Sequence, residues 1–219
     1  MAIQIQGSSG VVADVGGSTF RALKSQQMPL DYGSLGIYRK SLISGTMAAG
    51  LAANSEIFQF RWTDATRLCA VRRVTIDGLS GSATAFAAGL GNLQLYPARA
   101  FTASGTGGNA GTLTGNTGKM RTSMGTTLLG DVRIASTAAL GVGTKTLDTD
   151  PIGQISLSFG TAVSVQYIAV PTPLLGEDIG PEHPLVLAQN EGFMIRASVP
   201  ATGTWQFGVT VCWAEVTAF

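Results

Sequence analysis

The stretch from Pro184 to Glu215 reads PLVLAQNEGFMIRASVPATGTWQFGVTVCWAE, and it contains two runs in which apolar and polar residues alternate. Residues 193–199 and 205–213 each place an apolar side chain at every second position. Successive side chains of a strand point to opposite faces, so each run is predicted to be a strand with one apolar face. The joint at residues 200–203, PATG, combines a proline with a glycine, which is typical of a hairpin loop. The stretch therefore predicts an antiparallel hairpin that forms part of a core.

Shorter runs with strand character precede this stretch and predict an all-β fold. They cover residues 58–62, 68–76, 84–88, 93–96, 131–135, 144–147, 155–159 and 163–170. The turn dipeptide Asp77-Gly78 is predicted to end the second run, and Pro97 is predicted to close the fourth. The alanine-rich residues 44–54 are compatible with a short helix, although Gly45 and Gly50 weaken it. Short strands at regular spacing without long helices favour an antiparallel two-sheet sandwich, of which the jelly roll is the commonest eight-stranded form.

The chain is predicted to have two parts. Residues 1–45 contain short β-prone pieces separated by glycine and serine, and they are expected to form an extended N-terminal arm or a small docking segment. Residues 46–219 are expected to form the sandwich. Within it, residues 102–127 consist largely of Gly, Thr, Ser and Asn, which predicts a long loop that is either a surface excursion or a pairing segment for a neighbouring subunit. The prolines between residues 171 and 184 predict an extended connection.

The composition predicts contacts with other protein surfaces. Only 12% of the 219 residues are charged, about half the usual share, while 29 are glycine and the mean hydropathy is +0.27. So few charges leave part of the surface to be buried against copies of the chain or against other proteins. A net charge of +1, with Arg72-Arg73 as the one adjacent basic pair, does not favour nucleic acid or an acidic membrane as partner.

No apolar run is long enough to predict a membrane span, and the N-terminus lacks the pattern of a signal peptide. The two cysteines, Cys69 and Cys212, lie inside strand-like runs and are expected to be buried reduced thiols in preference to a disulfide. Two cysteines and one histidine have no spacing that predicts a metal site.

Two glycine-rich segments resemble the phosphate loops of sugar kinases of the glucokinase type. The first runs from Asp14 to Thr19 (DVGGST) with Arg21 after it, and the second from Gly105 to Gly108 (GTGG). That chemistry needs the loops to sit between strands and long helices, which this chain does not predict, so a plain glycine turn is preferred at each place. His183 has no nucleophile elbow to partner it, and a surface or packing role is expected.

The carboxylates are also expected to have structural roles. Those at Asp148, Asp150, Glu177, Asp178 and Glu182 lack the alternating spacing of a calcium loop and are interpreted as solvated turn residues. Glu191 is expected to cap a turn, and Glu215 to pair with Arg196 or Arg61. No catalytic, cofactor-binding or metal-binding residue is predicted, and no cofactor.

Four blocks of the chain resemble virion structural proteins of tailed bacteriophages. They are residues 45–62 (GTMAAGLAANSEIFQFRW), 68–74 (LCAVRRV), 117–148 (beginning TGKMRTSMGTT) and 183–215. The resemblance covers about three quarters of the chain and lies in overall texture, with no diagnostic motif and no catalytic residues to carry over. It implies a protein assembled in the bacterial cytoplasm and located in the virion, on the head or in the tail.

Together these observations predict a non-enzymatic virion component. The leading hypothesis is a homo-oligomer, with a trimer preferred, that binds the major capsid protein lattice through its N-terminal arm as a decoration or cement protein. The alternative is a tail or head-fibre adhesin that binds a host surface glycan. Its candidate aromatic residues are Tyr32, Tyr38, Tyr96 and Tyr167, each of which is more simply read as a packing residue.

Overall fold

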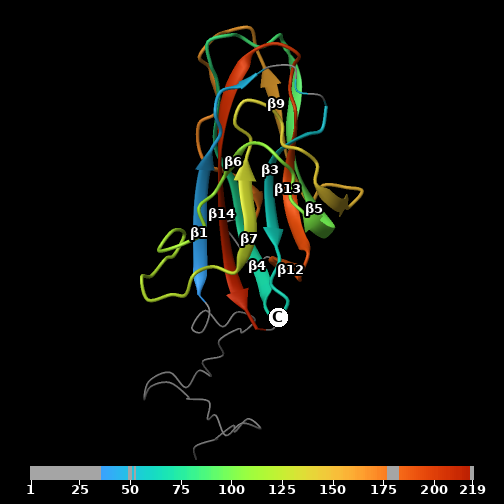
Figure 1. Ribbon diagram of the computed structural model, residues 1–219. Coiled ribbons are helices and arrows are strands. Elements are labelled where there is room, and N and C mark those ends of the chain that lie inside the picture. Colours follow the sequence, from blue (N-terminus) through green and yellow to red (C-terminus); the bar gives the residue numbers. More distant parts are fainter. Residues whose placement is uncertain (1–35, 49–50, 52, 177–182, 218–219) are drawn as a thin grey trace, which may run out of the picture. The chain divides into compact units, whose positions relative to one another are not determined.

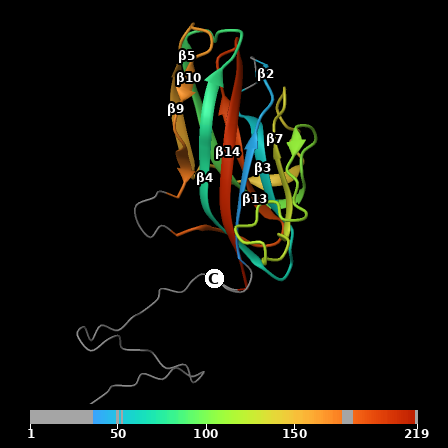
Figure 2. The same ribbon diagram turned by 90° about the vertical axis from the view of Figure 1, so that its left-hand side faces the viewer.

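The computed structural model describes residues 36–48, 51, 53–176 and 183–217. The chain divides into a unit of residues 1–30, which lies outside these ranges, and a unit of residues 31–219. The described residues form strands and loops without a helix, and the strands build two antiparallel sheets packed face to face (Figures 1 and 2). The prediction of an all-β, two-sheet sandwich is thus confirmed.

The first sheet is built around two long central strands, which Figure 2 shows side by side. They are β14 (Thr204–Val216) and β4 (Leu68–Gly81), and they pair along almost their full length. On the outer side of β14 lie β1 (Ile37–Ile43) and β2 (Met47–Ala48). On the outer side of β4 lie three short strands, β10 (Gln166–Ile168), β11 (Thr172–Leu175) and β12 (Leu185–Leu187).

The second sheet has β13 (Glu191–Ser198) at its centre, between β3 (Ser55–Trp62) and β5 (Gly89–Ala103). Beyond β3 lie β7 (Leu129–Ile134) and the two-residue β6 (Asn109–Ala110). Beyond β5 lie β8 (Thr144–Leu147) and β9 (Gly153–Phe159).

The strand pairs are nested along the chain. The first strand, β1, pairs with the last, β14, and β3 pairs with β13. Further inward, β4 pairs with β10, β11 and β12, and β5 pairs with β9. The chain therefore folds like one long hairpin that is rolled up, so that β14 also meets β4 and β13 also meets β5.

The core fills the space between the sheets with aromatic side chains. Trp62, Trp205 and Trp213 are all buried. The Phe60 ring stacks on Phe193 within its own sheet, with ring centroids 4.9 Å apart, and meets Trp213 of the other sheet edge-on at 5.4 Å. Such offset and edge-on pairs add to the free energy gained by burying the rings, and they join the two layers.

The predicted C-terminal hairpin is wrong, although both of its strands are present. β13 pairs with β3 and β5, whereas β14 lies in the other sheet and pairs with β1, β2 and β4. Residues 199–203 therefore carry the chain from one sheet to the other. Alternation defines which face of a strand is buried, but two apolar faces can meet across a core as well as lie side by side.

The predicted turn at Asp77-Gly78 is a β-bulge inside β4. The pairing passes from Gly208 opposite Gly78 to Val209 opposite Ile76, which leaves Asp77 as the extra residue. Its carboxylate accepts hydrogen bonds from the hydroxyls of Thr75 and Thr210. These bonds satisfy the carboxylate on the sheet surface, so the strand continues where a turn was expected.

Three other local predictions differ from the structure. Residues 84–88 form a loop, because Thr84 and Ala87 donate their N–H groups to threonine hydroxyls of the 202–204 segment and not to a strand ladder. β5 runs through Pro97, which still pairs with Phe193. Of the possible helix at residues 44–54, the described part contains β2, which pairs with β14, because an edge position on the sheet outweighs the helical propensity of alanine.

Two segments predicted from composition now have a position. β1 lies inside residues 1–45, so the sandwich begins earlier than residue 46, and residues 1–35 of the predicted arm lie outside the described residues.

The long loop at residues 102–127 lies on the side of the sandwich where β1 is, as Figure 1 shows. It bonds to both strands, through Gly118 to Arg39 and through Gly111 to Val132. It is a surface excursion held by its own chain.

Candidate functional site

A β-bulge in β3 places two polar side chains on the outer face of the second sheet. Phe58 lies opposite Ile195 and Glu56 lies opposite Arg196, so Ile57 is the extra residue. Without the bulge, Glu56 and Gln59 would point to opposite faces, because they are three positions apart. With it they share a face, and the Gln59 amide nitrogen donates a 2.8 Å hydrogen bond to Glu56 Oε2.

Lys145 of β8 reaches the same carboxylate oxygen. Its Nζ lies 2.8 Å from Glu56 Oε2, and only 1% of the lysine side chain and 3% of the glutamate side chain are exposed. The ammonium also donates to the carbonyl oxygen of Val142 and lies 5.0 Å from the centre of the Phe101 ring. A buried ion pair of this kind is costly to desolvate, and removing one partner leaves a buried charge without compensation.

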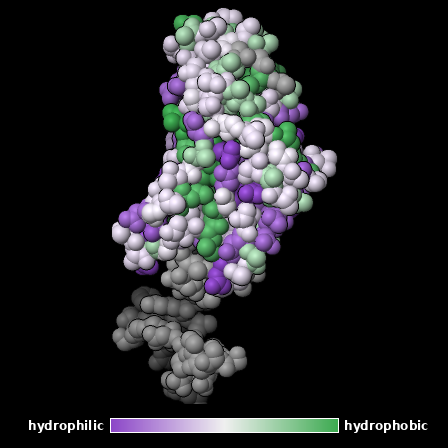
Figure 3. Space-filling model, in the orientation of Figure 1, coloured by the Kyte–Doolittle hydropathy of each residue, from purple (hydrophilic) through white to green (hydrophobic). Residues whose placement is uncertain are grey.

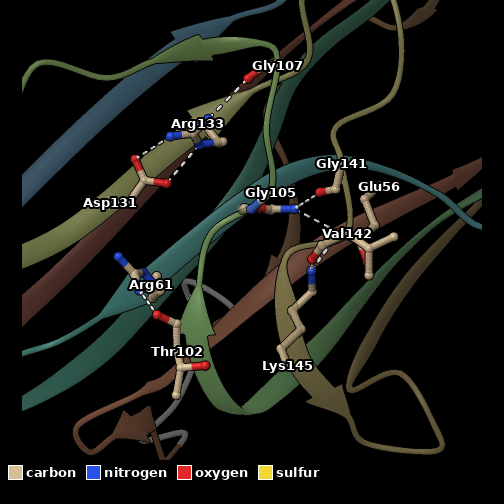
Figure 4. Close-up of polar contacts among 11 residues, drawn as sticks. Glu56, Arg61, Thr102, Gly105, Gly107, Asp131, Arg133, Gly141, Val142 and Lys145 are labelled. Carbon is tan, nitrogen blue, oxygen red and sulfur yellow. Dashed lines mark hydrogen bonds and ion pairs between the residues drawn. The ribbon is translucent and has the colours of Figure 1, made fainter.

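The Gln59 carboxamide is held at every polar atom. Its Oε1 accepts the N–H of Gly105 at 2.9 Å, and its Nε2 also donates to the carbonyl oxygen of Gly141 at 2.8 Å. Two loops are thereby fixed over the sheet (Figure 4). A Cβ on Gly105 would lie 1.6 Å from the Gly141 oxygen, so glycine is required for the loops to approach this closely.

The apolar surroundings of these groups come from a second, small core. Ala98, Phe101 and Met194 are buried together on this side of the sheet, with Tyr96 and Leu147 packed against them. At the rim, Arg61 donates to the Thr102 carbonyl oxygen at 2.6 Å, and Arg133 pairs with Asp131 and bonds to the Gly107 carbonyl oxygen (Figure 4). We call Glu56, Gln59 and Lys145 the outer cluster.

The electrostatics of the outer cluster favour a less basic amine. Burial lowers the pKa of Lys145, while the hydrogen bond and the negative charge of Glu56 act in the opposite direction. Glu56 Oε1 is buried and has no hydrogen-bond partner, and the Arg196 Nη2 lies 3.8 Å away from it. An amine, a carboxylate and a carboxamide thus meet in one water-poor site, a combination that can support acyl transfer.

A second buried carboxylate, Glu215, anchors the end of the long loop. Its Oε1 accepts hydrogen bonds from the Thr127 hydroxyl, the Leu128 N–H at 3.0 Å and the Trp213 indole N–H at 3.3 Å. Burial raises the pKa of Glu215, and these donors partly offset that rise. Burial and the nearby Glu215 charge raise the pKa of Tyr38 to about 12.

The predicted partners of Glu215 are wrong. Arg196 lies beside Glu56 and Arg61 bonds to Thr102, so both arginines belong to the second sheet. Glu191 does cap a turn, since its carboxylate accepts the Ala188 N–H at 2.8 Å, and it also pairs with Arg99. The prediction for Glu191 is therefore confirmed.

The cysteines are not bonded to each other. Cys69 is buried and Cys212 is half-buried, and both are free thiols. Burial raises the pKa of each, most strongly for Cys69, so both remain protonated and unreactive near neutral pH. They belong to neighbouring strands, with Cys69 opposite Glu215 and Cys212 opposite Arg73.

The other candidates are separate from one another. Asp148 pairs with the exposed Arg99, Asp150 is exposed, and His183 contacts the Pro184 carbonyl oxygen. Within the described ranges, no three His, Cys, Asp or Glu residues are grouped so as to hold a metal ion. The candidate residues that lie outside the described ranges are Asp14 to Arg21, Tyr32, Glu177, Asp178 and Glu182.

Sequence reasoning missed the outer cluster. Gln59 occupies a position that alternation assigns to solvent, and Lys145 belongs to a run of only four strand residues. One available signal is Met194, an apolar residue at an outward position of β13, which indicates that this outer face is covered.

The described part of the chain contains no helix long and apolar enough to cross a membrane. Comparison of the chain with family models, with curated proteins and with solved structures finds no match.

Proposed function

We propose that this chain is a non-enzymatic structural protein of a tailed-phage virion. In this proposal it is a homo-oligomer, preferably a trimer, that binds the major capsid protein of the head lattice as a decoration or cement protein. The segment before β1 acts as the arm that reaches neighbouring subunits. The observation that carries the proposal is the amount of apolar side chain left exposed on a sandwich with few charges.

Large apolar side chains stand out from several parts of the described surface. Leu90 is 85% exposed, Ile43 69% and Val170 66%, and Val142, Met120 and Val163 are each more than half exposed. Figure 3 shows apolar residues as a band along the face that Figure 1 presents, between β1 and β7. Single exposed apolar residues are ordinary, but several of them with only 12% charged residues favour burial against other protein surfaces.

The nested strand pairs support a finer proposal for the fold, a jelly roll. An eight-stranded jelly roll consists of two Greek keys spread over two sheets, and it recurs in viral capsid and lectin domains. β1, β14, β4 and the β10–β12 group would form one sheet of it, and β3, β13, β5 and β9 the other. A viral capsid role and a glycan-binding role are both compatible with that architecture.

The aromatic residues favour the capsid role over the glycan-binding one. Glycan sites usually present an exposed aromatic face, but Tyr38 is buried and stacked on Trp213. Tyr96 lies against the Arg196 guanidinium, and Tyr167 packs on Phe86. These contacts support the packing roles expected for the three tyrosines.

Electron microscopy of phage particles with and without this protein tests the proposal. We expect extra density on the head lattice that disappears from particles lacking the protein. A variant without residues 1–35 is expected to remain folded but to lose particle binding. Density located only at the tail tip, or undiminished head binding by the shortened variant, would contradict the proposal.

The oligomer can be tested separately by sedimentation. We expect the combined variant Ile43→Lys, Leu90→Lys and Val170→Lys to shift the protein from trimer to monomer. Ser158→Lys is the matched control, because Ser158 is exposed and lies directly opposite Leu90 in the β5–β9 pair. A wild-type protein that sediments as a monomer at all concentrations would count against a homo-oligomer.

A further inference from the structure

The outer cluster contains the parts of an intramolecular transamidation site. We propose that Lys145 and Gln59 form an isopeptide bond with Glu56 as the proton-transferring catalyst, so that β8 and β3 become covalently joined. The inference rests on the geometry of these three side chains and holds whether or not the protein belongs to a virion.

Glu56 contacts both nitrogens whose bonds would change. Its Oε2 lies 2.8 Å from the lysine Nζ, which would attack, and 2.8 Å from the glutamine Nε2, which would leave. One carboxylate can therefore accept a proton from the nucleophile and deliver a proton to the leaving group, as general acid–base catalysis requires. Glu56 Oε1 has no hydrogen-bond partner and is available for the second transfer.

The carbonyl side of Gln59 is also prepared. Gly105 donates its N–H to Gln59 Oε1 at 2.9 Å, which is where negative charge develops when an amine adds to the amide carbon. The Gly141 carbonyl oxygen fixes the amide plane through Nε2. Because both loops and the small core exclude water, hydrolysis does not compete with attack by the amine.

The burial of the lysine supports its role as nucleophile. A protonated ammonium has no lone pair, and the lowered pKa of Lys145 makes the neutral amine easier to form. The charges around Lys145 are Glu56, which stabilises the ammonium, and Arg196, which disfavours it. The Phe101 ring and the Val142 carbonyl oxygen complete its surroundings.

The reaction balances without a co-reactant. Glu56 takes one proton from the Lys145 ammonium, and the neutral amine attacks Gln59 Cδ to give a tetrahedral oxyanion on Oε1. The carboxylic acid then protonates Nε2, the Cδ–Nε2 bond breaks, and ammonia leaves. Glu56 removes the remaining extra proton from Nζ and passes it to the ammonia, which departs as ammonium. One amide bond is lost and one is formed, and no oxidation occurs.

Peptide mapping of the purified, folded full-length protein tests the inference. Trypsin normally cleaves after Lys145, but an acylated lysine is not recognised. We expect a linked species that joins residues 41–61 to residues 134–196, in which the bond after Lys145 is uncleaved and whose mass is lower than the sum of these two peptides by one ammonia. The same protein incubated in denaturant is expected not to accumulate that species, because the outer cluster exists only in the folded chain.

Two variants separate the chemistry from simple packing. Lys145→Arg keeps the positive charge but supplies no amine nucleophile, and Glu56→Gln removes the proton acceptor, so both are expected to lack the linked species. Lys119→Arg, at a half-buried lysine of the long loop outside the outer cluster, is the matched control and is expected to form it fully. Complete cleavage after Lys145 in the wild-type protein, after prolonged incubation of the folded form, would overturn the proposal without reliance on any variant.

Discussion

At the scale of single residues, Gly203 and Gly107 separate backbone strain from steric exclusion. Both have a positive φ, of 106° and 80° respectively. A Cβ on Gly107 would meet nothing, whereas one on Gly203 would lie 2.9 Å from the backbone of Phe86. We expect Gly107→Ala to destabilise the protein by about 1 kcal/mol through backbone strain alone. Gly203→Ala should cost about 1–3 kcal/mol more, because residues 199–203, which carry the chain from one sheet to the other, must shift to make room for the methyl group. Urea unfolding of the two variants measures the difference, and equal losses would show that sterics at Gly203 do not matter.

Glu215 is expected to make stability depend on pH. Its pKa is raised in the folded protein, chiefly by burial. An acid of this kind binds its proton more tightly when folded, so its contribution is fully present below the unfolded pKa and is lost as the pH rises through the folded pKa. Glu215→Gln keeps an oxygen for the Thr127, Leu128 and Trp213 donors but does not titrate.

The test is the free energy of unfolding in urea from about pH 4 to pH 8. The wild-type protein should lose more stability toward neutral pH than Glu215→Gln does. Asp150→Asn serves as control, since Asp150 is exposed, and should follow the wild-type curve. Parallel curves for wild type and Glu215→Gln would refute the role given to this carboxyl.

At the scale of elements, the C-terminal end of the long loop is held to the sandwich by a buried hydrogen bond. Thr127 donates its hydroxyl to buried Glu215, and the exposed Thr66 donates its own hydroxyl to half-buried Asp64 at 3.0 Å. Both bonds join a threonine to a carboxylate, so they differ chiefly in burial. We expect Thr127→Val to cost about 1–3 kcal/mol, because it leaves a buried carboxylate short of a donor, and Thr66→Val to cost under about 1 kcal/mol.

Hydrogen exchange gives a second measurement for the same pair. Thr127→Val should speed exchange of the amides that tie the loop to its neighbours, Gly111 and Arg39. Thr66→Val should leave those amides unchanged. Faster exchange in both variants would mean that the loop is anchored elsewhere.

Alternation in the sequence located the strands well, because it reports which side of a strand is buried. The runs at 58–62, 131–135, 144–147 and 155–159 overlap β3, β7, β8 and β9 respectively. It does not supply the partners, and for this reason it predicts one hairpin from two C-terminal strands that belong to different sheets. Partner choice depends on contacts between residues far apart in the chain, which no local pattern contains.

The outer cluster escaped prediction for a related reason. Glu56 and Gln59 share a face only because Ile57 is bulged, and a bulge is set by the pairing with β13. Lys145 joins them from a strand more than 80 positions away. The sequence alone therefore predicts the outward position of Gln59 but neither its burial nor its neighbours.

At the scale of the whole molecule, the nested order makes the last strand indispensable. β14 pairs with β1, β2 and β4, and it contributes Trp205 and Trp213 to the core. Its loss would leave β1 without a neighbour in its sheet and would leave one edge of β4 unpaired. By contrast, residues 1–35 contain none of the described strands.

Two truncations of unequal length exploit this asymmetry. Removal of residues 201–219 should abolish cooperative urea unfolding and the near-ultraviolet signal of the remaining buried tryptophan, Trp62, because the first sheet loses its central strand. Removal of residues 1–35, although it deletes more of the chain, should leave both signals and the unfolding midpoint unchanged. Cooperative unfolding of the C-terminal truncation would contradict this prediction. It would mean that β1 and β4 can pair directly with each other, so that the sandwich does not need β14 between them.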